Sequence, residues 1–196
     1  MKVEVTDNYL APSEFIEIRD TIFSTRLGWI FHSTTVMGKN FSKTEITQDG
    51  SYSDDISIPC EDQDLDDIQF VCPIYDGNRW LNDPNIMAPL SRAMGDVSWI
   101  RIKLNMLPHA SKVYPKGGES GWHQDTPYHD SLTSIFYLNT NNGYTEFEDG
   151  TKVDSVANRL ATFPAGMSHR GSSCSDSTTR VVANLNYYPK ASRDYS

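Results

Sequence analysis

Apolar residues recur with a helical period in the first half of the chain. The stretch "PSEFIEIRDTIFSTR", residues 12–26, opens with a Pro-Ser pair that is typical of a helix N-terminus. Its apolar side chains fall on one broad helical stripe, made of Phe15, Ile16, Ile18, Ile22 and Phe23. A second helix is predicted over residues 84–94, with Asn82 or Asp83 as its cap. Its inward-facing residues are Ile86, Met87, Leu90 and Met94.

From residue 98 onward the hydrophobic period changes to two. In "WIRIKLNM", the apolar Ile100, Ile102, Leu104 and Met106 alternate with Arg101, Lys103 and Asn105. Further strands are predicted in "SLTSIFYLNT", "YTEFE", "TKVDSV", "NRLATF" and "TRVVANLNYY", and "NNG" and "DG" suit hairpin turns. Two helices followed by about seven or eight short strands indicate a mainly β protein, in which N-terminal helices back a β-sandwich or jelly roll.

The bulk composition suits one globular domain. The chain has 196 residues, of which 38% are hydrophobic and 22% charged, so a sizeable core can form. No window approaches the roughly 18 apolar residues of a membrane span, and the N-terminus lacks the apolar segment of a secretory signal. Cys60, Cys72 and Cys174 are odd in number and include no C-x-x-C pair. We therefore expect reduced thiols and a cytoplasmic location.

The formal net charge of −9 disfavours nucleic acid as a partner, because phosphate binding needs a cationic face. Much of the acid lies in "DDISIPCEDQDLDD", residues 54–67, which contains no basic residue. We interpret this run as a solvated surface loop. A docking face for a basic peptide is the alternative.

One histidine and one carboxylate lie two residues apart in "ESGWHQDTPY". On a strand, residues i and i+2 face the same way, so His123 and Asp125 can reach one cation. An imidazole nitrogen and a carboxylate oxygen suit divalent iron, manganese or zinc. The best third ligand is His169, which follows a predicted strand and turn 44 residues after Asp125. The other histidines are interpreted as polar residues of the surface or core: His32, His109 and His129.

Two further side chains are candidates for binding a carboxylate beside such a metal. Arg180 opens the last predicted strand, eleven residues after His169, and its planar fork of donors suits a carboxylate. The residues on its face of the strand are Val182, Asn184 and Asn186. Tyr137 offers a hydroxyl as a second donor. Taken singly, Arg180 is more often a surface ion pair and Tyr137 more often a packing residue.

The ordered set of these features resembles the iron(II)/2-oxoglutarate-dependent dioxygenases. The set comprises H-x-D, "IFYLNTNNGYTEFEDG", "NRLATFPAGMSH" and an arginine eleven residues after the distal histidine. Within that superfamily it looks like the prolyl 4-hydroxylase-like branch, including its small phage-borne versions, over residues 98–188. The resemblance implies a single domain, 1–196. In it, a cupin-like double-stranded β-helix core (98–190) is backed by helical and pocket-covering segments (1–97).

By this resemblance, His123, Asp125 and His169 hold non-haem iron(II) and leave positions open for other ligands. The family fills those positions with 2-oxoglutarate and dioxygen, releases succinate and carbon dioxide, and hydroxylates an unactivated C–H bond. Arg180 matches the residue that binds the C5 carboxylate of 2-oxoglutarate, and Tyr137 its hydroxyl partner. L-ascorbate is a further implied cofactor. A peptide, protein or amino-acid substrate is expected, as is a monomer or weak homodimer, in the host cytoplasm if the chain is phage-encoded.

The resemblance leaves two assignments undecided, the residue that contacts the cosubstrate near the metal and the shape of the substrate pocket. The family often has a tyrosine before H-x-D that reaches the cosubstrate near the metal; Tyr114 in "VYPKGG" matches it slightly better than Asn105. Asn186 stands where relatives often carry a large aromatic residue, which puts prolyl specificity in doubt. Two other classes remain. A non-catalytic cupin-like metal binder would not need Arg180, and a zinc hydrolase would need a general base, for which Glu119 is the nearby candidate.

Overall fold

Strands dominate the part of the chain that the computed structural model describes, namely residues 2–24, 27–32, 68–117, 121–128 and 130–190. Two helices, α1 (Pro12–Ser24) and α2 (Ala88–Met94), and a short 3₁₀ helix, η2 (Pro84–Met87), belong to the N-terminal half. The strands are β1 (Glu4–Thr6), β2 (Ile30–His32), β3 (Gln69–Asp76), β4 (Arg79–Trp80), β5 (Val97–Pro108), β6 (Leu132–Tyr137), β7 (Tyr144–Phe147), β8 (Lys152–Asp154), β9 (Leu160–Pro164), β10 (His169–Gly171) and β11 (Thr179–Pro189).

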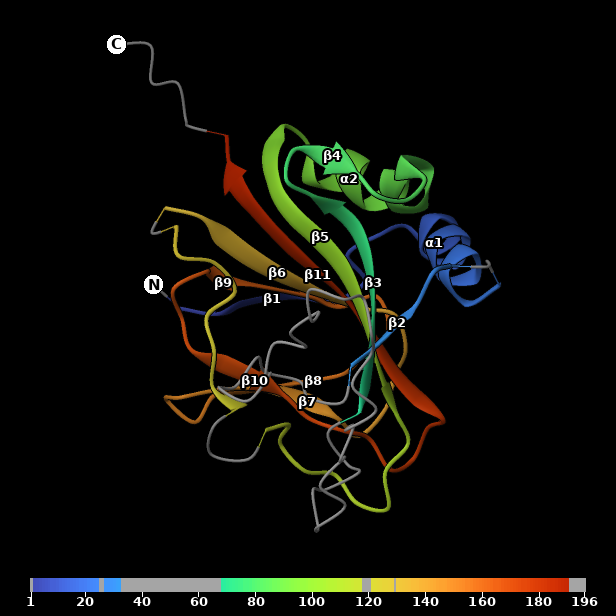
Figure 1. The fold of residues 1–196 in the computed structure, drawn as a ribbon, viewed down its shortest axis with the longest axis vertical. Helices are drawn as coiled ribbons and strands as arrows, with labels where there is room; N and C mark the ends of the chain where they lie inside the picture. Colours follow the sequence, from blue (N-terminus) through green and yellow to red (C-terminus); the bar gives the residue numbers. More distant parts are fainter. Residues whose placement is uncertain (1, 25–26, 33–67, 118–120, 129, 191–196) are drawn as a thin grey trace, which may run out of the picture.

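These strands form two antiparallel sheets (Figure 1). Among the described residues, the larger sheet has the order β1-β9-β6-β11-β5-β3-β2, with β4 paired to β3. The smaller sheet has the order β10-β7-β8, and an antiparallel bridge between His123 and His169 brings the H-x-D segment beside β10. The non-sequential strand order is that of a double-stranded β-helix, or jelly roll, which confirms the predicted fold class.

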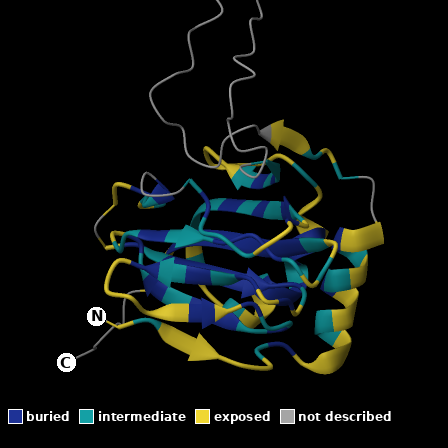
Figure 2. Ribbon diagram, turned by 90° about the horizontal axis from the view of Figure 1, so that it is seen from below, coloured by how far each residue is buried: buried dark blue, intermediate teal, exposed yellow. Residues whose placement is uncertain are grey.

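The helices cover the outer face of the larger sheet. Ile18 and Ile22, one turn apart on α1, pack with Leu90 of α2 against the outward side chains of the central strands. On β11 those side chains are Val181, Ala183, Leu185 and Tyr187, as the alternation predicted. Full burial of one large apolar side chain stabilises the fold by about 1.5–3 kcal/mol. Figure 2 shows the central strands as the most buried part of the molecule.

The inner faces of the two sheets form the cavity that holds the candidate site. A second apolar cluster fills part of this space, with Phe147 of β7 and Phe163 of β9 in edge contact at 4.8 Å between ring centroids. The polar positions of β5 and β11 face the same space. Their register pairs Arg101 with Asn186, Lys103 with Asn184, and Asn105 with Val182. The strand alternation therefore places a row of polar side chains inside the barrel.

Two expectations about the helices need correction. Ile16 and Phe23 of α1 are 47% and 51% exposed, so the buried stripe is narrower than predicted. Only the side of α1 that carries Ile18 and Ile22 lies against the sheet. The second predicted helix is two short segments, η2 and α2, and the Asp83 side chain accepts a hydrogen bond from the Asn85 amide at the start of η2.

The "NNG" hairpin prediction is wrong. Strand β6 pairs with β11 and β9, whereas β7 pairs with β10 and β8, so this segment connects the two sheets. Gly143 does not have a positive φ; it is required because an added Cβ would lie 2.7 Å from Cδ of Arg180. The "DG" turn is as predicted, because Gly150 has φ +85° and joins β7 to β8.

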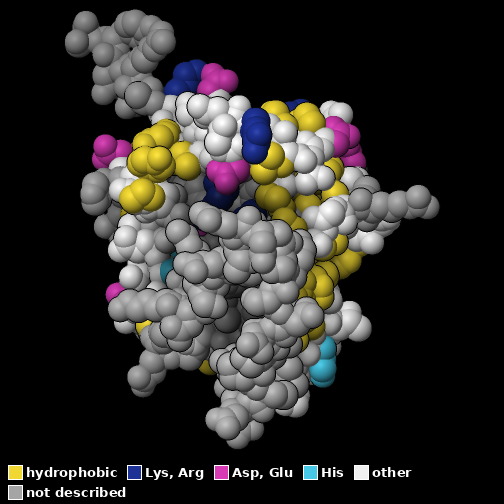
Figure 3. Space-filling view, in the orientation of Figure 1, with side chains coloured by type: hydrophobic (Ala, Val, Ile, Leu, Met, Phe, Trp, Pro, Cys, Tyr) yellow, Lys and Arg dark blue, Asp and Glu magenta, His cyan; other side chains and the backbone are white. Residues whose placement is uncertain are grey.

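Several expectations fall wholly or partly on residues that are not described. The acidic run 54–67 and Cys60 lie outside the described residues, as does most of segment 38–75, the part of 1–97 expected to cover the mouth of the cavity. Cys72 and Cys174 are buried free thiols, and burial raises the pKa of both. Within the described chain, no helix has the length and apolarity needed to cross a membrane. Charged and hydrophobic side chains are interspersed over the described part of the face in Figure 3.

Candidate metal centre and anion-binding cavity

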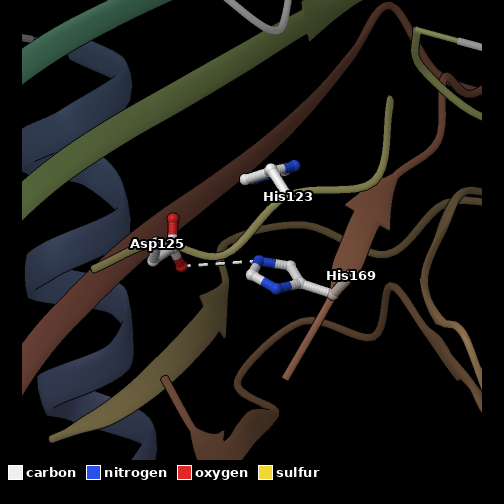
Figure 4. Close-up of side chains that lie close together, drawn as sticks. All are labelled: His123, Asp125 and His169. Atoms are coloured by element: carbon white, nitrogen blue, oxygen red, sulfur yellow. Dashed lines mark ion pairs between the residues drawn. The ribbon is translucent and has the colours of Figure 1, made fainter. Parts of the chain in front are cut away.

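His123, Asp125 and His169 converge on one point between the two sheets (Figure 4). Their candidate ligand atoms all lie within 4.8 Å of one another. Reciprocal backbone hydrogen bonds fix the two histidines side by side, from His123 N to His169 O at 3.1 Å and from His169 N to His123 O at 3.0 Å. Asp125 Oδ2 lies 3.4 Å from Nε2 of His169. The chain therefore brings together the three predicted ligands.

Backbone carbonyls orient both imidazole rings. The Nδ1 atom of His123 lies 2.9 Å from Gly121 O, and Nδ1 of His169 lies 3.1 Å from Met167 O. Because a carbonyl oxygen can only accept, each Nδ1 carries the proton and donates. Each Nε2 is then left with a free lone pair, as a metal-binding histidine requires. Burial lowers the pKa of His123, which favours the neutral, metal-binding form of its imidazole.

Asp125 is held as a buried carboxylate by three neighbours. Asn184 Nδ2 donates to Oδ2 at 2.9 Å, and Arg101 donates from one Nη to Oδ1 at 3.2 Å and to the backbone oxygen at 3.1 Å. Burial by itself raises the pKa of Asp125, but the neighbouring His169 and Lys103 side chains, together with the hydrogen bond from Asn184, bring it well below its usual range. The carboxylate is ionised and available to a cation.

Arg180 lies at the other end of the cavity. Its side chain is buried, its Nε donates to Ser155 Oγ at 2.7 Å, and one Nη donates to Thr145 Oγ1 at 3.1 Å. The Tyr137 hydroxyl also donates to Thr145 Oγ1, at 2.8 Å. Within the described chain, no carboxylate lies within ion-pair distance of Arg180, and burial lowers its pKa. A buried guanidinium without an anion is costly, so this end of the cavity suits an anionic ligand.

One cavity connects the two ends. Its lining includes His123, His169 and Arg180, and its remaining described side chains are mostly polar or basic, among them Gln69, Lys103, Asn105, Lys116, Arg170 and Asn184. No Asp or Glu is among the described lining residues. The Oδ1 atoms of Asn105 and Asn184 are buried and accept no hydrogen bond from described residues. Such orphaned acceptors indicate a bound molecule or water.

The two candidates for the position near the metal lie in different surroundings. Asn105 lines the cavity, whereas Tyr114 is not among the described lining residues and its backbone is bonded to Ser173. Tyr137 is fully buried and is not among the described lining residues; its hydroxyl shares Thr145 Oγ1 with Arg180, whose guanidinium carbon lies 5.6 Å from the Tyr137 ring centroid. Asn186 is also buried, where it accepts from Arg101 Nε at 3.1 Å and donates to Thr133 at 2.9 Å.

Sequence reasoning missed Thr145, Ser155 and Lys103 as parts of this site. Thr145 lies on β7 and Ser155 just after β8, far from Arg180 along the chain, so only the tertiary fold joins them. Lys103 carried a detectable signal, since it shares a strand face with Asn105. Of the other histidines, His109 is exposed, with Nδ1 3.1 Å from Ser177 O, and His32 belongs to β2. His129 and Glu119 lie outside the described residues.

The chain has the fold of prolyl hydroxylases and 2OG-Fe(II) oxygenases. It aligns with a prolyl hydroxylase from Trichoplax adhaerens, in complex with a hypoxia inducible factor peptide fragment, at a TM-score of 0.53 and 15% identity (96% of this chain, 84% of that one). A 2OG-Fe(II) oxygenase family oxidoreductase from Burkholderia pseudomallei aligns at a TM-score of 0.57 and 9% identity, over 94% of this chain and 84% of that one. HygX from Streptomyces hygroscopicus, with nickel and 2-oxoglutarate bound, aligns at a TM-score of 0.51 and 11% identity, over 96% of this chain and 83% of that one. No family profile and no curated sequence matches.

Proposed function

We propose that this chain is a non-haem iron(II)- and 2-oxoglutarate-dependent dioxygenase that hydroxylates an unactivated C–H bond, in a single domain spanning 1–196. The closest activity class is the prolyl 4-hydroxylase-like one, acting on a peptidyl or amino-acid substrate and releasing succinate and carbon dioxide. One observation carries this conclusion. A His-Asp-His cluster and a buried arginine without a carboxylate partner among the described residues lie at the two ends of one cavity.

The residues divide between metal and cosubstrate. His123, Asp125 and His169 would hold iron(II), a donor set that leaves coordination positions open. Arg180 would bind the C5 carboxylate of 2-oxoglutarate with its guanidinium fork, steadied by the Thr145 and Ser155 hydroxyls and by Tyr137 behind them. Asn105 would form a hydrogen bond with 2-oxoglutarate near the metal. When bound, iron(II) and 2-oxoglutarate supply the oxidising chemistry; the chain positions them and excludes water.

Two rival functions are less well supported. A cupin-like metal binder without turnover has no use for a buried arginine opposite the metal. A zinc hydrolase needs a general base beside its bound water. The described lining of the cavity contains no carboxylate, and the oxygens of the neighbouring Asp125 already meet Asn184, Arg101 and His169. We therefore retain the dioxygenase, and with it the proposals of L-ascorbate as a reductant, a cytoplasmic location and a monomer or weak homodimer.

An anaerobic titration tests whether metal and keto acid share this site. Adding 2-oxoglutarate to the iron(II)-loaded protein should produce a saturable metal-to-ligand absorption band, because the keto acid would chelate the metal that the triad holds. A metal binder or a zinc hydrolase would give no such band. Absence of the band at millimolar 2-oxoglutarate would contradict the proposed function.

Asn105→Ala is expected to weaken 2-oxoglutarate binding roughly tenfold, because it removes one hydrogen-bonding group from the cavity wall. Tyr114→Phe should leave the affinity unchanged, since Tyr114 is not part of the described lining. The same absorption titration measures both. Equal effects of the two substitutions, or a larger effect of Tyr114→Phe, would contradict the assignment of Asn105 as the residue that contacts 2-oxoglutarate near the metal.

Gly121→Ala is expected to weaken metal binding by about 10- to 100-fold, the usual cost of disturbing a group that orients a ligand. A Cβ at this position would lie 1.8 Å from the backbone oxygen of Lys116, so the carbonyl that orients His123 must move. Gly28→Ala is the matched control, because nothing lies within 4 Å of its Cβ position. Competition with a chromogenic chelator gives the affinities. Unchanged metal affinity in Gly121→Ala would show that His123 is oriented in another way.

A further inference from the structure

Lys103 projects into the cavity at its metal end. It lies on β5 between Arg101 and Asn105, on the inner face of the larger sheet, and its neighbours in register are Asn184 of β11 and Pro73 of β3. Asn184 in turn donates to Asp125. Lys103 lines the same cavity as His123 and His169. Its ammonium group therefore lies beside the space that a substrate must enter to reach the metal.

Lys103 is a half-buried lysine whose charge the described protein does not neutralise by contact. No hydrogen bond and no ion pair within 4.0 Å joins its side chain to any described residue. Burial lowers the pKa of Lys103 and the charge of Asp125 raises it, but the oxygens of that carboxylate are bonded to Asn184 and Arg101 and face His169. An ammonium group withdrawn from water without a partner is unfavourable, so the site favours a ligand that supplies an anion.

Binding of 2-oxoglutarate would not neutralise the positive charge of Lys103. Under the proposed function, the C5 carboxylate of 2-oxoglutarate pairs with Arg180 and its other end pairs with the metal. Arg170 is already paired with Glu146 at 2.8 Å and stacked on Trp122 at 4.1 Å. Lys116 contacts Ile68 O and the Tyr114 hydroxyl, both at 3.4 Å. Among the cationic side chains of the described lining, Lys103 is therefore the one available to bind an anion other than 2-oxoglutarate. Asn184, its neighbour in register on β11, has a buried Oδ1 atom without a hydrogen-bond partner among the described residues.

We propose that Lys103 binds a carboxylate of the substrate, so that the substrate is a small acid, such as a free amino acid, and not a proline within an uncharged peptide segment. Asn184 Oδ1 accepts from an N–H or O–H group of the same molecule. This inference rests on the proposed function and names its substrate class. It assigns Lys103 as a specificity-determining residue, because an unpaired ammonium group in the cavity beside the metal ligands disfavours a neutral group there.

The probes are acetate and its neutral counterpart acetamide. Both are titrated into protein loaded with manganese(II) and saturated with 2-oxoglutarate, a form that does not turn over. Proton relaxation of the probe methyl group reports binding near the paramagnetic metal. We expect saturable relaxation enhancement with acetate and at least about tenfold weaker binding of acetamide. Lys103→Met should weaken acetate at least about tenfold, Lys103→Arg should retain it, and the exposed control Lys112→Met should match the parent.

Three results would overturn the inference. Acetate and acetamide binding alike, or acetate giving no enhancement, would mean that the cavity does not select an anion. Acetate binding equally to the parent and Lys103→Met would place the anion elsewhere. A tenfold loss of 2-oxoglutarate affinity in Lys103→Met would assign the lysine to the cosubstrate. Failure of 2-oxoglutarate to bind the metal-loaded parent is a different result, because it contradicts the proposed function itself.

Discussion

His169→Ala is expected to abolish iron-dependent turnover of 2-oxoglutarate. The substitution removes one of two Nε2 donors, and the remaining His123 and Asp125 offer too few ligands to hold iron(II) in place. It also leaves a void beside Phe163, whose ring centroid lies 4.8 Å from that of His169, at a cost of roughly 1–3 kcal/mol of unfolding free energy. Circular dichroism should therefore show a folded protein that forms no succinate.

The matched control is His109→Ala, which removes an exposed histidine away from the cavity and should leave turnover unchanged. His123→Ala and Asp125→Ala should behave like His169→Ala, because each removes one of the three donors. If folded His123→Ala and His169→Ala both kept parental turnover, the cluster between the sheets would not be the metal site.

Arg180→Ala is expected to weaken 2-oxoglutarate binding by about 100-fold or more. Breaking a buried, charge-assisted pair costs roughly 3–5 kcal/mol, and each 1.4 kcal/mol corresponds to about tenfold in affinity. Arg180→Lys should recover only part of the loss, since an ammonium keeps the charge without the two-pronged geometry. Iron binding should hardly change, because the triad lies at the other end of the cavity. The anaerobic absorption titration measures the keto acid and a chelator competition measures the metal.

The control for this prediction is Arg92→Ala, which removes a surface arginine paired with Glu14 at 3.4 Å. It should bind 2-oxoglutarate like the parent. Parental affinity in Arg180→Ala would mean that the carboxylate is held elsewhere, and the proposed function would lose its main support.

The sheet was predictable because its strands alternate so regularly. On β5 and β11, one set of side chains packs under the helices and the other lines the cavity, and both sets could be read from the period of two. The turns were harder. "NNG" looks like a hairpin, yet the adjacent strands belong to different sheets, and the glycine is needed because Arg180 passes close by. A close approach between residues that are distant in the sequence cannot be predicted from a local sequence pattern.

The three metal-ligand candidates were predictable and the rest of the site only in part. The pattern H-x-D with a histidine after a later strand suggested His123, Asp125 and His169, and the resemblance of the ordered set to a known family selected them. For the position near the metal the sequence offered Tyr114 and Asn105, and of the two only Asn105 is among the described lining residues of the cavity. Thr145 and Ser155 could not be found, because ordinary hydroxyls become notable only once the second sheet brings them against Arg180.

The most direct measurement is conversion of 2-oxoglutarate to succinate by purified protein supplied with iron(II), dioxygen and L-ascorbate, with a panel of free amino acids and proline-containing peptides. We expect succinate formation that requires iron(II), is stimulated by at least one acid of the panel, and is lost in His169→Ala and Arg180→Ala. Succinate formation that is absent in the iron-loaded parent, or that persists undiminished in both variants, would contradict the assignment of this site as a dioxygenase centre.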